Sequence, residues 1–181
     1  MIDEFWDDVD GGFFFTGKSH EELIVRSKDF FDNATPSGNS VAADVLLRFS
    51  LLSGNEDYAR RAVTIFRINS QQLQRYPPAF GRALCALDFH LAGPKEIVIL
   101  GEPNAADTKD LQAAAWTEYL PNKVMLVASG SEVQARQSLP LLTNRTASDN
   151  RATAFICEHF ACKQPVQTPD ELKAQLRRNW T

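Results

Sequence analysis

The residues best suited to chemistry gather near the beginning of the chain, in the stretch GGFFFTGKSHEELIVRSKDFFDNATPSGNS at residues 11–40. It contains an imidazole, carboxylates and cations within a short distance, namely His20, Glu22, Arg26, Lys28 and Asp32. Ser37 and Asn39 follow in the segment PSGNS. Serine and asparagine cap helix N-termini, where backbone N–H groups attract anions. The stretch therefore suits a hydroxyl-rich or anionic ligand.

A purely structural interpretation of the same residues is also open, and residue types alone favour it. Residues 13–15, after Gly11 and Gly12, and residues 23–26 have the composition of two strands joined as a β-hairpin. The charged residues would then only pair with one another across an exposed hairpin, and PSGNS would only cap the helix that follows. Such exposed ion pairs contribute little stability.

A second constellation is CEHFAC at residues 157–162. Cys157, His159 and Cys162 could supply three ligands to zinc, but a structural zinc site usually has a second close pair of cysteines. The four intervening residues also depart from the C-x-x-C redox motif, which weakens the case for a reactive thiol. Buried small side chains at the end of a strand are the favoured alternative. Cys85 lies in an apolar helical pattern and is expected in the core.

The bulk composition excludes several classes of function. The 181 residues carry a formal net charge of −4, which gives no electrostatic reason to bind nucleic acid or an anionic membrane. No apolar run is long enough to span a bilayer, so we expect a cytoplasmic protein. Three cysteines make no disulfide framework, and we expect reduced thiols. No nucleophile elbow, phosphate-binding glycine loop or dinucleotide fingerprint occurs, and no cofactor is expected.

Three helices are predicted in the first half of the chain. Apolar residues recur at three- and four-residue spacing over residues 41–52, about 57–75 and 80–91. Gly54 ends the first of these helices and Pro77 follows the second. Short links between consecutive helices predict antiparallel neighbours.

The period changes to that of strands in the second half. Residues 96–100 and 123–128 are continuous apolar runs of strand length, and residues 107–119 between them have helical spacing. This pattern predicts a β-α-β unit, whose crossover makes the two strands parallel.

A third strand and a final helix complete the predicted C-terminal part. The strand lies at residues 152–157, and Thr168 opens the helix with a capping box. We expect a small α/β segment with a mostly parallel three-stranded sheet. The change of period at Gly93 predicts two domains, of residues 1–93 and 94–181.

Five segments occur in order along the chain: GGFFFT, HEELIVRSKDFFDNATPSGNSVAA, RYPPAFGRALCALDF, LPNKVMLVA and CEHFACKQPV. Together they resemble the C-terminal portion of thioredoxin-domain-containing proteins of the spermatogenesis-associated, YyaL-like type. The resemblance covers nearly the whole chain. It departs from the family pattern at Asn33, which stands in place of a glycine; asparagine tolerates the left-handed conformation better than most residues.

The resemblance implies a mixed, mainly α fold with three parts. These are an N-terminal thioredoxin-like domain, a central (α/α) six-hairpin toroid similar to that of N-acylglucosamine 2-epimerases, and a small α/β segment. This chain would hold a β-hairpin, about three antiparallel helices of the toroid and the α/β segment. By analogy with the sugar epimerases, the residues that would face the toroid cavity are His20, Glu22, Arg26, Lys28, Asp32, Ser37 and Asn39.

Two functions follow as hypotheses. In a complete toroid, Arg26 and Lys28 would hold a sugar-like substrate and His20 or Glu22 would act as acid or base, while the fragment alone would be inactive. Alternatively, the chain is a non-catalytic binding or scaffolding module of a larger redox-linked protein. Helices without their neighbours expose apolar faces, so we expect self-association or binding to the missing N-terminal part. We expect a partial product of a longer gene, with half of a split protein as the alternative.

Overall fold

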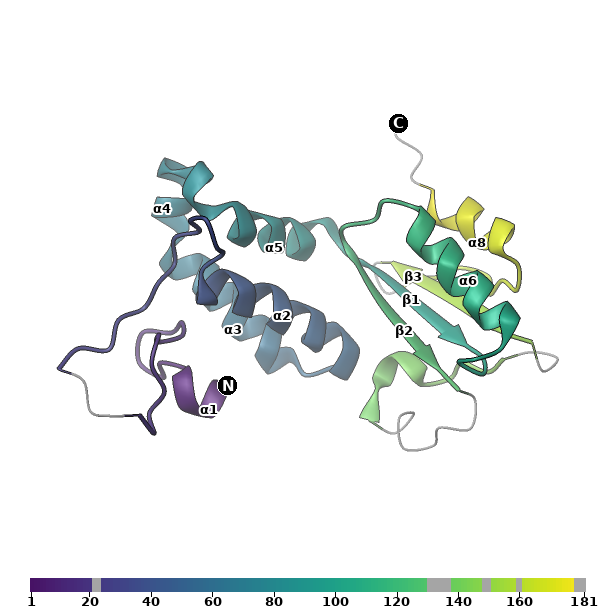
Figure 1. Ribbon diagram of the computed structural model, residues 1–181, viewed down its shortest axis with the longest axis horizontal. Helices are drawn as coiled ribbons and strands as arrows, with labels where there is room; N and C mark the ends of the chain where they lie inside the picture. The colour runs from purple at the N-terminus through teal and green to yellow at the C-terminus, as the bar shows by residue number, and fades with distance from the viewer. Residues whose placement is uncertain (21–23, 130–137, 148–150, 159–160, 178–181) are drawn as a thin grey trace. The chain divides into compact units, whose positions relative to one another are not determined.

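The computed structural model describes residues 1–20, 24–129, 138–147, 151–158 and 161–177. The chain divides into an N-terminal unit, Met1–Leu91, and a C-terminal unit, Ala92–Thr181. Helices make up the regular structure of the first unit, and the second contains a sheet (Figure 1). None of the helices in these ranges combines the length and the apolar character that a membrane span requires.

Two antiparallel helices form the centre of the N-terminal unit. Its helices are α1 (Ile2–Phe5), α2 (Gly38–Ser53), α3 (Glu56–Ile68), α4 (Ser70–Arg75), the 3₁₀ helix η1 (Pro77–Phe80) and α5 (Gly81–Ala92). Gly54 ends α2 in the left-handed conformation, and Asn55 caps α3. This short connection places α2 and α3 side by side (Figure 1). The helix predicted over residues 57–75 is divided at Asn69, whose side chain bonds back to the carbonyl of Ile65.

The predicted β-hairpin over residues 13–26 does not form among the described residues. Phe13 makes an isolated antiparallel bridge with Trp6, and their buried rings lie 5.0 Å apart. The physical reason is that the side chain of Asn39, rather than a second strand, bonds both backbone groups of Phe13. Leu23, in the second predicted strand, lies outside the described residues.

The C-terminal unit contains a four-stranded mixed sheet in the order β2-β1-β3-β4. Its strands are β1 (Lys95–Leu100), β2 (Lys123–Ala128), β3 (Thr153–Glu158) and β4 (Ala161–Cys162). β1 and β2 are parallel and are joined through α6 (Ala106–Thr117). The predicted β-α-β unit is therefore confirmed.

The prediction of a mostly parallel three-stranded sheet is wrong. β3 pairs antiparallel with β1, with Ile156 opposite Ile97, and β4 pairs antiparallel with β3. The described part of the connection between β2 and β3 includes the short 3₁₀ helix η2 (Pro140–Leu142). An apolar run indicates a buried strand but does not give its direction.

One face of the sheet packs against α6 and α8 (Pro169–Leu176), as Figure 1 shows. The core between them consists of aliphatic side chains from both layers: Ile97, Ile99, Leu111, Ala114, Ala115, Ala152, Ala154, Ile156, Val166, Leu172 and Leu176. The predicted capping box at the start of α8 is confirmed. The hydroxyl of Thr168 accepts from the N–H of Glu171 and donates to its carboxylate at 2.7 Å. These contacts lower the pKa of Glu171.

Removal of the Thr168 hydroxyl should destabilise α8. Thr168→Ala is expected to lower the free energy of unfolding by about 1 kcal/mol, because the backbone N–H of Glu171 loses its acceptor. Denaturant unfolding followed by circular dichroism measures the change. Thr146→Ala is the matched control, since Thr146 is exposed, and it should leave the free energy unchanged. Equal stability of the two variants would contradict the role assigned to the cap.

Candidate functional site

The segment PSGNS caps α2, as predicted. Ser37 is the N-cap residue, and its Oγ accepts a hydrogen bond from the N–H of Ser40 at 3.1 Å. The same hydroxyl donates to Ser40 Oγ at 2.8 Å. Both serines are buried. The hydroxyl groups at the start of α2 therefore bond to each other and to the helix backbone.

Asn39 connects α2 to the N-terminal segment. Its Oδ1 accepts from the N–H of Phe13 at 2.7 Å, and its Nδ2 donates to the carbonyl groups of Phe13 at 2.9 Å and Asp29 at 2.8 Å. Only 2% of Asn39 is exposed. Gly12, at φ 80°, permits the close approach, because a Cβ there would lie 3.3 Å from Asn39 Oδ1 and 3.0 Å from the ring of Phe30.

Asp32 lies at the N-termini of two helices. Its Oδ1 accepts from the N–H of Ser37 at 2.9 Å, and its Oδ2 accepts from the N–H groups of Arg82 at 2.7 Å and Ala83 at 3.1 Å. A carboxylate at a helix N-terminus satisfies free backbone donors and is stabilised by the helix dipole. Asp32 therefore caps α5 from a distant part of the chain and also holds the N-cap residue of α2.

Lys28 is half-buried beside a carboxylate of the N-terminal segment. Its Nζ lies 2.5 Å from Asp7 Oδ2 and donates to the carbonyl of Gly11 at 2.7 Å. The side chains of Lys28 and Asp7 are only 15% and 11% exposed. The Lys28 hydrogen bond, helped by the N–H of Val9, lowers the pKa of Asp7. This ion pair is thus enclosed rather than spread over an exposed hairpin.

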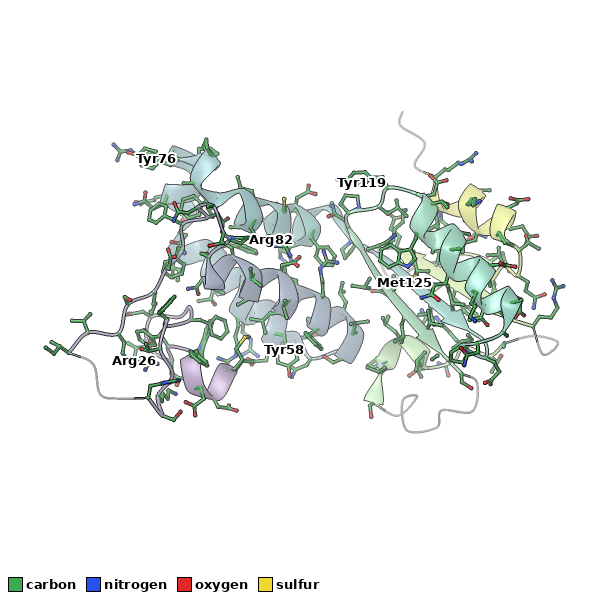
Figure 2. The ribbon with its side chains drawn as sticks, viewed as in Figure 1. Arg26, Tyr58, Tyr76, Arg82, Tyr119 and Met125 are labelled. Carbon is green, nitrogen blue, oxygen red and sulfur yellow. A yellow bond between two sulfur atoms is a disulfide. The ribbon has the colours of Figure 1, made fainter. Side chains whose placement is uncertain are left out.

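Arg26 stacks on the ring of Phe14, with its Cζ 4.1 Å from the ring centroid. Its Nη2 donates to the carbonyl groups of Thr16 at 2.5 Å and Glu4 at 3.3 Å. Lys28 Nζ lies 4.9 Å from the centroid of the same ring. The structure therefore brings these two predicted cations together around one aromatic ring, and Figure 2 labels Arg26 in this loop.

The two predicted acid–base residues are placed differently. His20 is exposed, and its backbone N–H donates to the carbonyl of Gly17 at 3.4 Å. The pKa of the neighbouring Glu4 is lowered mainly by hydrogen bonds from Ser19 and only secondarily by the charge of His20. Glu22 lies outside the described residues.

A charged cluster that was not predicted lies between α2 and α5. Asp44 is 5% exposed; it accepts from Arg48 Nε at 3.1 Å and lies 2.5 Å from Arg82 Nη2. The side chains of Arg48 and Arg82 are 34% and 40% exposed. Figure 2 labels Arg82 near the start of α5. The signal available in the sequence was the i,i+4 spacing of Asp44 and Arg48 on a predicted helix.

An aromatic cavity of about 210 Å³ lies beside Asp29 and Asn39. Its lining combines rings with a few polar groups: Met1, Phe5, Phe13, Phe14, Phe15, Asp29, Gly38, Asn39 and Ala42. Phe15 is 77% exposed. Asn39 thus contributes to the wall of a cavity, although its hydrogen bonds are made to the protein backbone.

Two of the three cysteines, Cys157 and Cys162, differ from the reduced thiols that we predicted, whereas Cys85 is free. Cys157 and Cys162 form a disulfide, because they are directly opposite each other in the antiparallel β3–β4 pair. Sulfur atoms bonded to each other are not thiolate ligands, and the described residues contain no cluster suited to a metal ion. His159 lies outside those residues. Cys85 is exposed rather than in the core, because it lies on the outer side of α5.

The chain is similar to longer curated proteins along nearly all of its length. It is 38% identical over 177 residues to spermatogenesis-associated protein 20 of Rattus norvegicus, with 96% of this chain and 22% of the relative covered. The human protein of the same name is 37% identical over 175 residues, with 95% and 22% covered. An uncharacterized protein of Caenorhabditis elegans is 27% identical over 170 residues, with 94% and 23% covered.

The similarity concerns only a part of each relative. The chain spans less than a quarter of the length of these proteins. No protein-family model matches the chain, and no solved structure matches it. The chain is therefore similar to one segment of spermatogenesis-associated protein 20.

Proposed function

We propose that the N-terminal unit is a non-catalytic helical binding and scaffolding module of a larger, cytoplasmic protein. The observation that carries this proposal is the apolar outer face of α2. Val41, Val45, Phe49 and Leu52 follow one another at helical spacing along that face. Val41 is 39% and Phe49 is 53% exposed.

The opposite face of α2 is apolar as well. Ala42, Ala43, Leu46 and Leu47 are buried there, and α2 packs closely on α3. A helix with apolar residues on two opposite faces is usually enclosed by neighbours on both sides. We therefore assign the outer face to a partner segment, and name Val41, Val45, Phe49 and Leu52 the α2 outer stripe.

The partner segment is proposed to be helical and to belong to the longer polypeptide. The chain corresponds to only 22% of the length of spermatogenesis-associated protein 20. In the (α/α) six-hairpin toroid implied by the family resemblance, α2, α3 and α5 would be late helices of the ring, and earlier helices would cover the α2 outer stripe. In the absence of the rest of the longer polypeptide, a second copy of this chain would bind to the α2 outer stripe.

The polar residues near α2 support a structural role better than a catalytic one. Asp32 accepts three backbone N–H groups, and Asn39 makes three hydrogen bonds to the backbone. A substrate-binding or acid–base group needs bonding capacity that is available to a ligand. Use of Asp32 by a ligand would leave backbone N–H groups without partners at the starts of α2 and α5. Use of Asn39 would do the same to backbone groups of Phe13 and Asp29.

The α2 outer stripe should cause self-association of the isolated chain. Replacing Val41 and Phe49 together by serine is expected to weaken self-association at least about tenfold, because apolar area is lost from the contact. Light scattering coupled to size-exclusion chromatography over a concentration series measures the association. Val9→Ser is the control, since Val9 is 89% exposed outside the helices and should leave association unchanged. Association that is absent, or equal in both variants, would refute the docking role.

Asn39 should contribute strongly to the stability of the N-terminal unit. Asn39→Ala is expected to cost about 3 kcal/mol of unfolding free energy, because the N–H and carbonyl of Phe13 would be left without these partners. Urea unfolding measures the cost. Asn33→Ala is the matched control, as Asn33 is exposed and should be nearly neutral. An Asn39→Ala protein with the same free energy of unfolding as Asn33→Ala would contradict the structural role.

The aromatic cavity favours a second candidate function, the binding of a carbohydrate by the complete protein. Phenylalanine rings can stack on the apolar face of a sugar, and Asp29 lies at the same cavity. In this candidate Arg26, Lys28 and Ser37 bind substrate groups, and His20 or Glu22 acts as acid or base.

Saturation-transfer NMR with a panel of sugars tests the carbohydrate candidate. A bound sugar should show contacts to aromatic protons, and Phe15→Ala should weaken binding about tenfold through the loss of ring stacking. Val9→Ser serves as the control for an exposed apolar loop residue. If no sugar binds, the carbohydrate candidate is abandoned, while the self-association measurement still decides the docking proposal.

A further inference from the structure

We propose that the Cys157–Cys162 disulfide is a thiol–disulfide exchange site, in which an external thiol attacks Cys162 and Arg145 stabilises the Cys157 thiolate that leaves. The two cysteines join β3 to β4. Arg145 Nη2 lies 2.8 Å from Cys157 Sγ and 3.5 Å from Cys162 Sγ. This site is in the C-terminal unit and does not depend on the function proposed for the N-terminal unit.

The disulfide lies on the side of the sheet away from α6 and α8. Ala154 and Ile156 belong to the core with those helices, and successive strand residues point to opposite faces. Phe155 and Cys157 therefore point to the other face. A cavity of about 620 Å³ is present there. Its lining includes both cysteines, Arg145, Glu96 and Lys163.

The two sulfur atoms differ in access to solvent. Cys157 is 3% exposed, whereas Cys162 is exposed on the short strand β4. Exchange depends on which sulfur is attacked and on how readily the other leaves as a thiolate. Access therefore directs an incoming thiolate to Cys162, and the buried Cys157 becomes the leaving group.

The charges around the disulfide favour a thiolate on Cys157. A guanidinium remains protonated in proteins and stabilises a thiolate that it contacts. Burial lowers the pKa of Arg145 and Glu96 opposes this. Burial also raises the pKa of Glu96, against the influence of Arg145. Lys163, the remaining charged group of the lining, donates its Nζ to the carbonyl of Gln175.

The exchange balances with two equivalents of a thiol. A thiolate, RS⁻, attacks Cys162 Sγ; an R–S–Sγ bond forms, the Sγ–Sγ bond breaks, and its electron pair stays on Cys157 as a thiolate beside Arg145. A second thiolate attacks the sulfur of R, which releases Cys162 as a thiolate and yields the oxidised product RSSR. The protein disulfide is reduced and the two external thiols are oxidised. The reverse sequence restores the disulfide.

The test measures reduction of the whole chain by excess glutathione, in a Cys85→Ser background that removes the free thiol of α5. Samples are quenched by alkylation and analysed by mass spectrometry. Arg145→Gln is expected to slow reduction about tenfold, and Arg145→Lys should restore most of the rate because it keeps the charge. Arg151→Gln, which removes an exposed cation of the same unit, is the matched control and should react at the original rate.

Two further readouts separate exchange chemistry from a structural effect. The mixed disulfide trapped early in the reaction should carry glutathione on Cys162. In a reduced Cys85→Ser, Cys162→Ser chain, the ultraviolet absorbance of the thiolate should show a larger ionised fraction of Cys157 at neutral pH than in the same chain with Arg145→Gln. If Arg145→Gln does not fold, the location of glutathione in the mixed disulfide is decisive.

Three results would overturn the proposal. The first is reduction of Arg145→Gln at the rate of Arg151→Gln. The second is glutathione found on Cys157 rather than on Cys162. The third is natively purified protein in which Cys157 and Cys162 are free thiols that glutathione disulfide does not convert to the bonded pair.

Discussion

The carboxylate of Asp32 is the contact on which the N-terminal unit depends. It receives backbone N–H groups from the starts of both α2 and α5. Hydrogen bonds to a charged group contribute about 1.5–3 kcal/mol each. The residues involved are 50 or more apart for the α5 contacts, so this one side chain closes a long loop. The positions of α2 and α5 relative to each other are therefore fixed by a polar contact as well as by packing.

The local features of the fold could be predicted from the sequence. Ser37 and Thr168 cap helices because their hydroxyl groups lie at the right distance from backbone donors of the next turn. Gly54 ends α2 because a residue without Cβ adopts positive φ at little cost. The β-α-β unit follows from the lengths of two apolar runs and the helical pattern between them. Each of these signals lies within a few neighbouring residues.

The features that sequence analysis missed depend on contacts between distant residues. The predicted hairpin does not form because Asn39, 26 residues further along the chain, bonds to Phe13. The alternation of a strand does not reveal this pairing. The antiparallel position of β3 and the disulfide depend on strand register. In the site, Asp32 and Lys28 have charge partners or donors that no local pattern identifies. Residue types therefore indicated which polar side chains could form a site, but not whether those side chains would bind a ligand or the protein backbone.

The polar contacts and the proposed docking surface belong to the same helix. Ser37 and Asn39 fix the first turn of α2, and the packing of α2 on α3 fixes its rotation. The α2 outer stripe is thereby held in one orientation before any partner binds. Preorganisation of this kind lowers the entropy cost of association, because the binding side chains do not have to be ordered at that moment. The network around Asp32 and Asn39 would thus influence binding at the α2 outer stripe, to which neither residue belongs.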